Sequence, residues 1–178
     1  CLSVFVTFLA AAAGSELFAA TNDAFASRIT LTGNPVSTTG DNLGATKEVG
    51  EPNHGGNTGG ASVWWTWTAP SAGVVTVSLA GSSFDTVLGV YTGTAVNALT
   101  LVAENDDFTG LTSQVSFNTA AGVTYQVAAD GFGGATGNIA LSLNVAMPPA
   151  NDNFSARITL TGSPVSTTGT NVAASKEA

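Results

Sequence analysis

Alternation of apolar and polar residues with a period of two constrains the fold of this chain more than any other feature. Residues 84–108 (FDTVLGVYTGTAVNALTLVAENDDF) contain two such runs, separated by the turn Thr92-Gly93-Thr94. A period of two places successive side chains on opposite faces of a strand. Further runs cover 28–31, 36–39, 62–68, 74–79, 114–118, 123–128 and 138–145. Gly-rich turns separate them and no helical period is present, so the sequence predicts an all-β, antiparallel sandwich of about 8–9 strands.

An internal repeat sets the size of the domain. Residues 22–48 recur as residues 151–177 at a constant offset of 129 residues, and 19 of the 27 paired positions are identical. A period of that length corresponds to a whole domain and not to a solenoid unit. The sequence therefore predicts a module over 21–147, a Pro-rich linker over 148–150, and the truncated start of a second copy of the module over 151–178.

The N-terminal residues 1–20 (CLSVFVTFLAAAAGSELFAA) form an apolar run followed by small residues. This order is typical of a secretory signal peptide, and the run is short for a transmembrane helix. The sequence predicts a signal-peptide remnant over 1–20 and a secreted or cell-surface protein whose mature module has no membrane contact. The alternative is a first buried strand or helix of the domain. No methionine precedes the run, so we expect the chain to be part of a longer protein.

Charge and cysteine content exclude several classes of function. The formal net charge is −8, and the four basic residues cannot form a stripe for nucleic acid or for anionic lipid. Cys1 is the single cysteine, which excludes an intrachain disulfide and a cysteine-based zinc site. The apolar fraction of 44% argues against disorder. An acidic surface is compatible with Ca²⁺ and equally with solubility alone.

Oxygen-bearing side chains gather at the two ends of residues 84–108. Ca²⁺ takes about six to eight oxygen ligands from carboxylates, carbonyls and water. The sequence predicts a calcium site that uses Asp85, Asn105, Asp106 and Asp107, with Asp23 or Asp130 as a further ligand. The alternative is a solvated turn whose side chains bond to their own backbone.

The tryptophans of residues 62–68 divide between the two faces of the predicted strand. Trp65 and Trp67 share one face with Val63, and we expect them to fill the core. Trp64 faces the other way, which makes it the candidate for stacking on a sugar ring.

The single histidine, His54, lies in a Gly-rich loop and has no second histidine with which to build a zinc site. No Gly-x-Ser-x-Gly motif accompanies it. We interpret His54 as a packing or hydrogen-bonding residue, and we predict no catalytic residue in this chain.

Several segments, taken in order, resemble the bacterial pre-peptidase C-terminal domain family, and especially the tandem copies found in large secreted proteins. They are SVWWTWTAP (62–70), GVVTV (73–77), FDTVLGVYTG (84–93), ENDD (104–107), AAGVTYQVAADG (120–131) and GNIALSL (137–143). The resemblance covers residues 22–145. It implies a jelly-roll-like β-sandwich that is usually non-catalytic and occurs beside secreted peptidases. Some members are similar to calcium-binding modules of bacterial collagenases, which implicates Asn22-Asp23 and Asn105-Asp106-Asp107.

We therefore expect a non-catalytic extracellular module, repeated in tandem, that serves adhesion, spacing or substrate attachment and is stabilised by Ca²⁺. Its expected partners are an extracellular polysaccharide or protein polymer and other copies of the module in the same chain. One alternative is a polymer-binding accessory module of a secreted peptidase or glycosidase. Another is a hydrolase domain in its own right.

Overall fold

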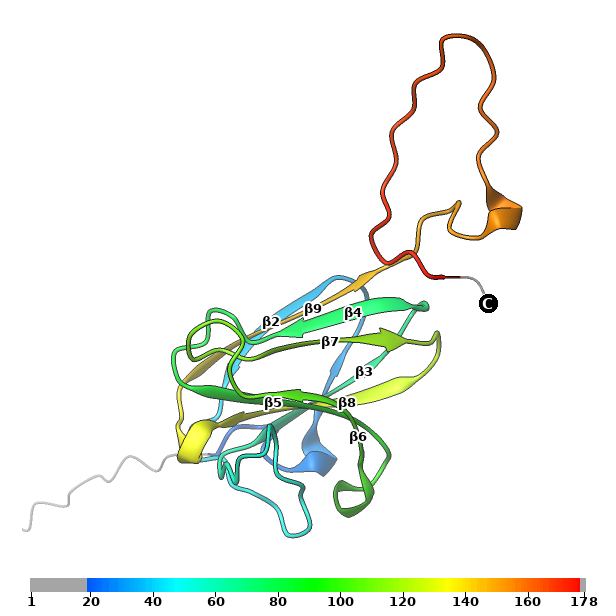
Figure 1. The fold of residues 1–178 in the computed structure, drawn as a ribbon. Coiled ribbons are helices and arrows are strands. Elements are labelled where there is room, and N and C mark those ends of the chain that lie inside the picture. Colours follow the sequence, from blue (N-terminus) through cyan, green and yellow to red (C-terminus); the bar gives the residue numbers. More distant parts are fainter. Residues whose placement is uncertain (1–18, 177–178) are drawn as a thin grey trace, which may run out of the picture.

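A computed structural model describes residues 19–176 of the chain (Figure 1). These residues contain nine strands. They are β1 (Ile29–Leu31), β2 (Val36–Asp41), β3 (Val63–Thr68), β4 (Gly73–Ser78), β5 (Thr86–Thr92), β6 (Thr100–Asn105), β7 (Gln114–Thr119), β8 (Thr124–Gly131) and β9 (Asn138–Ala146). Single 3₁₀ turns lie at Phe25–Ser27, Val96–Ala98, Phe132–Gly134 and Phe154–Ala156. The predicted signal-peptide remnant lies outside the described residues except for its last two. Between residues 19 and 176, no helix has the length and apolar character needed to cross a membrane.

Two sheets form a sandwich. One has the strand order β1-β3-β8-β5-β6 and the other the order β2-β9-β4-β7. The prediction of an all-β sandwich of eight or nine strands is confirmed. One pairing differs from the antiparallel expectation, because β1 runs parallel to β3. The chain leaves β1 through a short turn and enters β2 in the opposite sheet, so β1 has no hairpin partner and lies beside β3 instead.

The core lies between the sheets and is filled by alternate residues of their strands. It includes Trp65, Trp67, Val77, Leu88, Leu141 and Leu143. Trp65 and Trp67 are each 1% exposed, as predicted. Burial of large apolar side chains is the main favourable contribution to folding, so these alternating positions specify the sandwich.

The outer face of β3 is covered as well, which makes the interpretation of Trp64 as a candidate for stacking on a sugar ring wrong. Trp64 is 0% exposed. The Phe25 ring packs edge-on against it at a centroid distance of 5.1 Å, and the His54 ring does so at 5.4 Å. Asn22 fixes the covering segment, since its side-chain amide donates to the Trp64 carbonyl at 3.0 Å. A sugar ring therefore has no access to this indole.

Residues 151–176 extend away from the end of β9 and contain no strand (Figure 1). They nevertheless share two local features with residues 22–47, which form β1 and β2. Asp152 accepts the Ser175 N–H at 2.9 Å, as Asp23 accepts the Thr46 N–H at 2.6 Å. The 3₁₀ turn at Phe154–Ala156 likewise matches the one at Phe25–Ser27. The predicted division into module, linker and second copy stays a prediction.

Candidate functional site

An acidic rim, defined here as Asp85, Asp106 and Asp107, lies where β5 begins and β6 ends. β5 and β6 are antiparallel neighbours, and Leu88 pairs with Asn105. The residue before β5 and the residues after β6 therefore meet at one end of the sheet. Each of the three carboxylates places an oxygen within 4.8 Å of the other two. The structure thus brings together three of the predicted metal ligands.

Ser113 fixes the backbone on both sides of the acidic rim. This residue is buried, and its N–H donates to the Thr86 Oγ1 at 3.0 Å. Its hydroxyl lies within hydrogen-bond distance of the Thr86 and Asp106 carbonyls, to either of which its single hydrogen can donate. These contacts hold the loop after β6 against the start of β5. The rim is therefore positioned by backbone contacts that do not involve its own carboxylates.

Two carboxylate oxygens of the acidic rim are enclosed without a hydrogen-bond donor from the described residues. They are Asp85 Oδ1 and Asp106 Oδ1. Burial, followed by the charges of Asp107 and Asp85, raises the pKa of Asp106 above its ordinary value. Enclosed carboxylate oxygens favour either a proton or a cation, because both offset the lost hydration. A hard divalent cation fits this donor set, with water and carbonyls completing its coordination.

Asn105 does not present a free oxygen to the acidic rim. Its Oδ1 accepts the Gln114 N–H at 3.0 Å, and its Nδ2 donates to the Asp107 carbonyl at 3.2 Å. At this residue the structure shows the local turn bonding that was the alternative to a metal ligand.

Asp23 and Asp130 lie outside the acidic rim and have other partners. Asp23 bonds to Thr46, which stabilises the start of the module. Asp130 is 0% exposed and accepts backbone N–H groups from Gly60, Ala61 and Gly131. Neither residue joins the three clustered carboxylates.

We expect the contribution of Asp106 to the stability of the metal-free module to increase as the pH falls from neutrality toward 3.8, the ordinary pKa of aspartate. A raised folded-state pKa means that the folded protein binds this proton more readily than the unfolded chain. Its stability therefore decreases as the pH rises through the raised pKa. Urea unfolding midpoints in chelator across this range, for the parent and for Asp106→Asn, measure the effect. As the pH falls, the stability of the parent should shift upward relative to that of the variant, and a constant difference would contradict preferential protonation of Asp106 in the folded module.

His54 lies within hydrogen-bond distance of two buried residues, Glu51 and Tyr91, that sequence reasoning did not identify as its partners. The ring is 0% exposed; its Nδ1 lies 2.7 Å from the Tyr91 hydroxyl and its Nε2 lies 2.9 Å from Glu51 Oε1. Burial, and then the charges of Glu104, Glu51 and Asp130, raises the pKa of Tyr91. Both ring nitrogens are engaged, so neither is available to activate a serine. The predicted packing and hydrogen-bonding role is confirmed.

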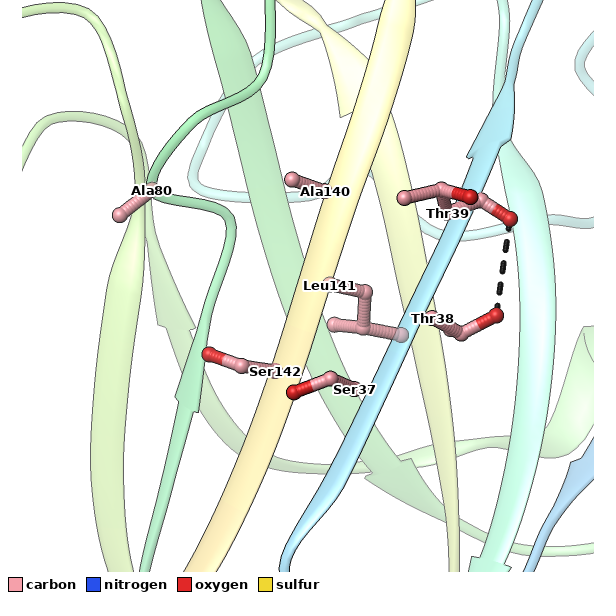
Figure 2. Close-up of a pocket in the computed structure, with 7 residues that line it drawn as sticks. All are labelled: Ser37, Thr38, Thr39, Ala80, Ala140, Leu141 and Ser142. Carbon is pink, nitrogen blue, oxygen red and sulfur yellow. Dashed lines mark hydrogen bonds between the residues drawn. The ribbon is translucent and has the colours of Figure 1, made fainter.

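A groove of about 380 Å³ lies on the outer face of the four-stranded sheet (Figure 2). Its lining consists of Ser37, Thr38, Thr39, Ala80, Ala140, Leu141 and Ser142. None of these side chains is ionisable, so the groove offers hydroxyl and methyl groups and no charge. Sequence reasoning missed it, because the signal consists only of small polar residues at outward-facing positions of β2 and β9.

The sequence matches no protein-family model and no curated protein. Among the solved structures that are similar in fold are the following two. One is the pre-peptidase C-terminal domain of a collagenase from Bacillus anthracis, with 15% identity, a TM-score of 0.46, and coverage of 66% of this chain and 94% of that one. The other is PliG from Aeromonas hydrophila, a periplasmic inhibitor of g-type lysozyme, with 15% identity, a TM-score of 0.45, and coverage of 67% and 96%.

Proposed function

We propose that this chain provides a non-catalytic, extracellular β-sandwich module that binds Ca²⁺ at its acidic rim. The module would act in tandem within a larger secreted or surface protein, in adhesion, spacing or attachment to a polysaccharide or protein polymer. The observation that carries the proposal is the convergence of three carboxylates, two of which have an enclosed oxygen that no donor of the described residues reaches. Such oxygens are ligands that Ca²⁺ accepts.

The bound ion would connect parts of the module that are distant in sequence. Asp85 precedes β5, whereas Asp106 and Asp107 begin the loop that leads to β7. A cation shared by them ties this loop to the five-stranded sheet and removes the repulsion among three like charges. Because the unfolded chain does not assemble the ligands, binding stabilises the folded module. At 100 times its dissociation constant a ligand adds about 2.7 kcal/mol to the free energy of unfolding.

Thermal melts of the chain in Ca²⁺ and in excess chelator test this proposal. The parent should melt several degrees higher in Ca²⁺. Asp106→Asn should lose that increase and, because it removes one repelling charge, should melt no lower than the parent in chelator. Asp41→Asn changes an aspartate outside the rim, one that accepts the Leu43 N–H, and should keep the full response to Ca²⁺. Identical parent melts with and without Ca²⁺ would refute calcium binding.

A further inference from the structure

The segment 22–47 occupies edge positions in both sheets. β1 pairs only with β3, and β2 pairs only with β9. Removing both strands leaves the orders β3-β8-β5-β6 and β9-β4-β7 intact. An edge element can therefore be replaced by an identical element from another chain without disturbing the central pairings, as in domain swapping.

A few specific contacts hold this segment in place. Leu31 is 7% exposed and belongs to the core between the sheets. Asn22 and Trp64 exchange two hydrogen bonds, one through the Asn22 side chain and one through its carbonyl. Asn42 is buried; it donates to the Ala61 carbonyl at 3.0 Å and accepts the Gly137 N–H at 2.8 Å.

Residues 151–176 carry the same docking side chains. Asn151, Leu160 and Asn171 are the counterparts of Asn22, Leu31 and Asn42. Leu160 is 55% exposed whereas Leu31 is 7% exposed, so a side chain that is suited to the core faces solvent here. Its burial would favour association.

Asn34 gives the resident segment an advantage over its repeat. Its side chain donates to the Val145 carbonyl at 3.0 Å and accepts the Val145 N–H at 2.7 Å. Ser163 stands at the corresponding position of the repeat and is too short to reproduce this pair of bonds. Residues 22–47 are therefore favoured over residues 151–176 at this position in a folded chain. We expect residues 151–176 of another chain to replace them most often when chains are unfolded and refold together.

From these contacts we propose that residues 151–176 of one chain can take the place of residues 22–47 in a second copy, so that copies of this chain associate by exchange of their edge strands. The interaction surface is the pair of edges that β3 and β9 present, and the partner is a second copy of this chain. This inference is independent of calcium binding.

A disulfide trap tests the exchange. Thr30 faces Thr66 across the β1–β3 pair, and Thr159 is the counterpart of Thr30. Facing positions on neighbouring strands lie within the span of a disulfide. The full chain with Cys1→Ser, Thr66→Cys and Thr159→Cys is unfolded, refolded at low and high protein concentration, oxidised and run on non-reducing gels. We expect disulfide-linked dimers and longer species that increase with concentration.

Three matched variants make the test specific. Adding Ser163→Asn supplies the missing amide and should increase the linked product several-fold. Leu160→Ala removes the core side chain and should reduce it several-fold, without loss of monomer stability, since Leu160 is exposed in the monomer. Ser116→Cys on β7, used in place of Thr66→Cys, measures random collision. The proposal would be overturned by any of three results. These are a yield of linked dimer no greater than with Ser116→Cys, a disulfide that forms within one chain, and a yield that neither Ser163→Asn nor Leu160→Ala changes.

Discussion

Asp130→Ala is expected to lower the free energy of unfolding of the module by about 3–5 kcal/mol. The carboxylate is fully buried at the end of β8. It accepts the Ala61 N–H at 2.9 Å, the Gly131 N–H at 2.7 Å and the Gly60 N–H at 3.2 Å. Truncation leaves the buried N–H groups of Ala61 and Gly131 without this acceptor, and each unsatisfied donor costs about 1–3 kcal/mol. Urea denaturation monitored by tryptophan fluorescence measures the loss.

Two further substitutions serve as comparisons for Asp130→Ala. Asp130→Asn keeps one acceptor oxygen but turns an NH₂ group toward the backbone donors, so its cost should be substantial. Asp107→Asn alters an exposed carboxylate of the acidic rim and should change stability by about 0.5 kcal/mol or less. A loss for Asp130→Ala as small as that for Asp107→Asn would contradict a structural role.

Gly59 shows how closely the preceding loop fits Asp130. A Cβ on Gly59 would lie 1.6 Å from Asp130 Oδ2, and its φ of +56° is in the left-handed region that favours glycine. Glycine at position 59 is therefore a requirement of the buried carboxylate. Composition alone marks the segment as a loop, whereas the carboxylate that organises it lies about 70 residues further along the chain.

The strands could be predicted because alternation is a local property of the sequence. Trp65 and Trp67 were placed correctly for that reason. Alternation assigns Trp64 to the opposite face but does not say what covers that face. The cover comes from Phe25 and His54, which lie in irregular segments without periodicity. The same limit applies to Tyr91, whose bond to His54 depends on the conformation of a loop.

The acidic rim was predictable in part for a similar reason. Asp85 and Asp106 flank an antiparallel pair, so a correct strand assignment already brings them to one end of the sheet. Asn105 and Asp23 have suitable oxygens but use them to accept the backbone N–H groups of Gln114 and Thr46. The type of side chain alone does not distinguish a ligand from a turn residue, because both roles need the same acceptor. Backbone geometry makes that distinction.

Trp64→Ala is expected to cost about 3–5 kcal/mol of folding free energy, as large-to-small substitutions of buried aromatic residues do. Trp64 packs against Phe25, Tyr91 and Ala128 in a second apolar cluster, and the His54 ring lies 5.4 Å from it. Removing the indole leaves a cavity between the five-stranded sheet and its cover. Phe132→Ala, which truncates an aromatic side chain that is 49% exposed, should cost far less. Urea unfolding of both variants measures the difference.

Trp64→Phe separates the contribution of volume from that of the indole nitrogen. The Trp64 Nε1 is buried and has no acceptor among the described residues, so replacement by phenylalanine removes an unsatisfied donor while keeping most of the ring. We expect this variant to lose clearly less stability than Trp64→Ala. A sugar-stacking residue would behave in the opposite way, because truncating an exposed ring abolishes binding and leaves folding intact. If Trp64→Ala unfolded at the same urea concentration as the parent, the indole would have to be accessible, and a sugar-binding role at β3 would again be open.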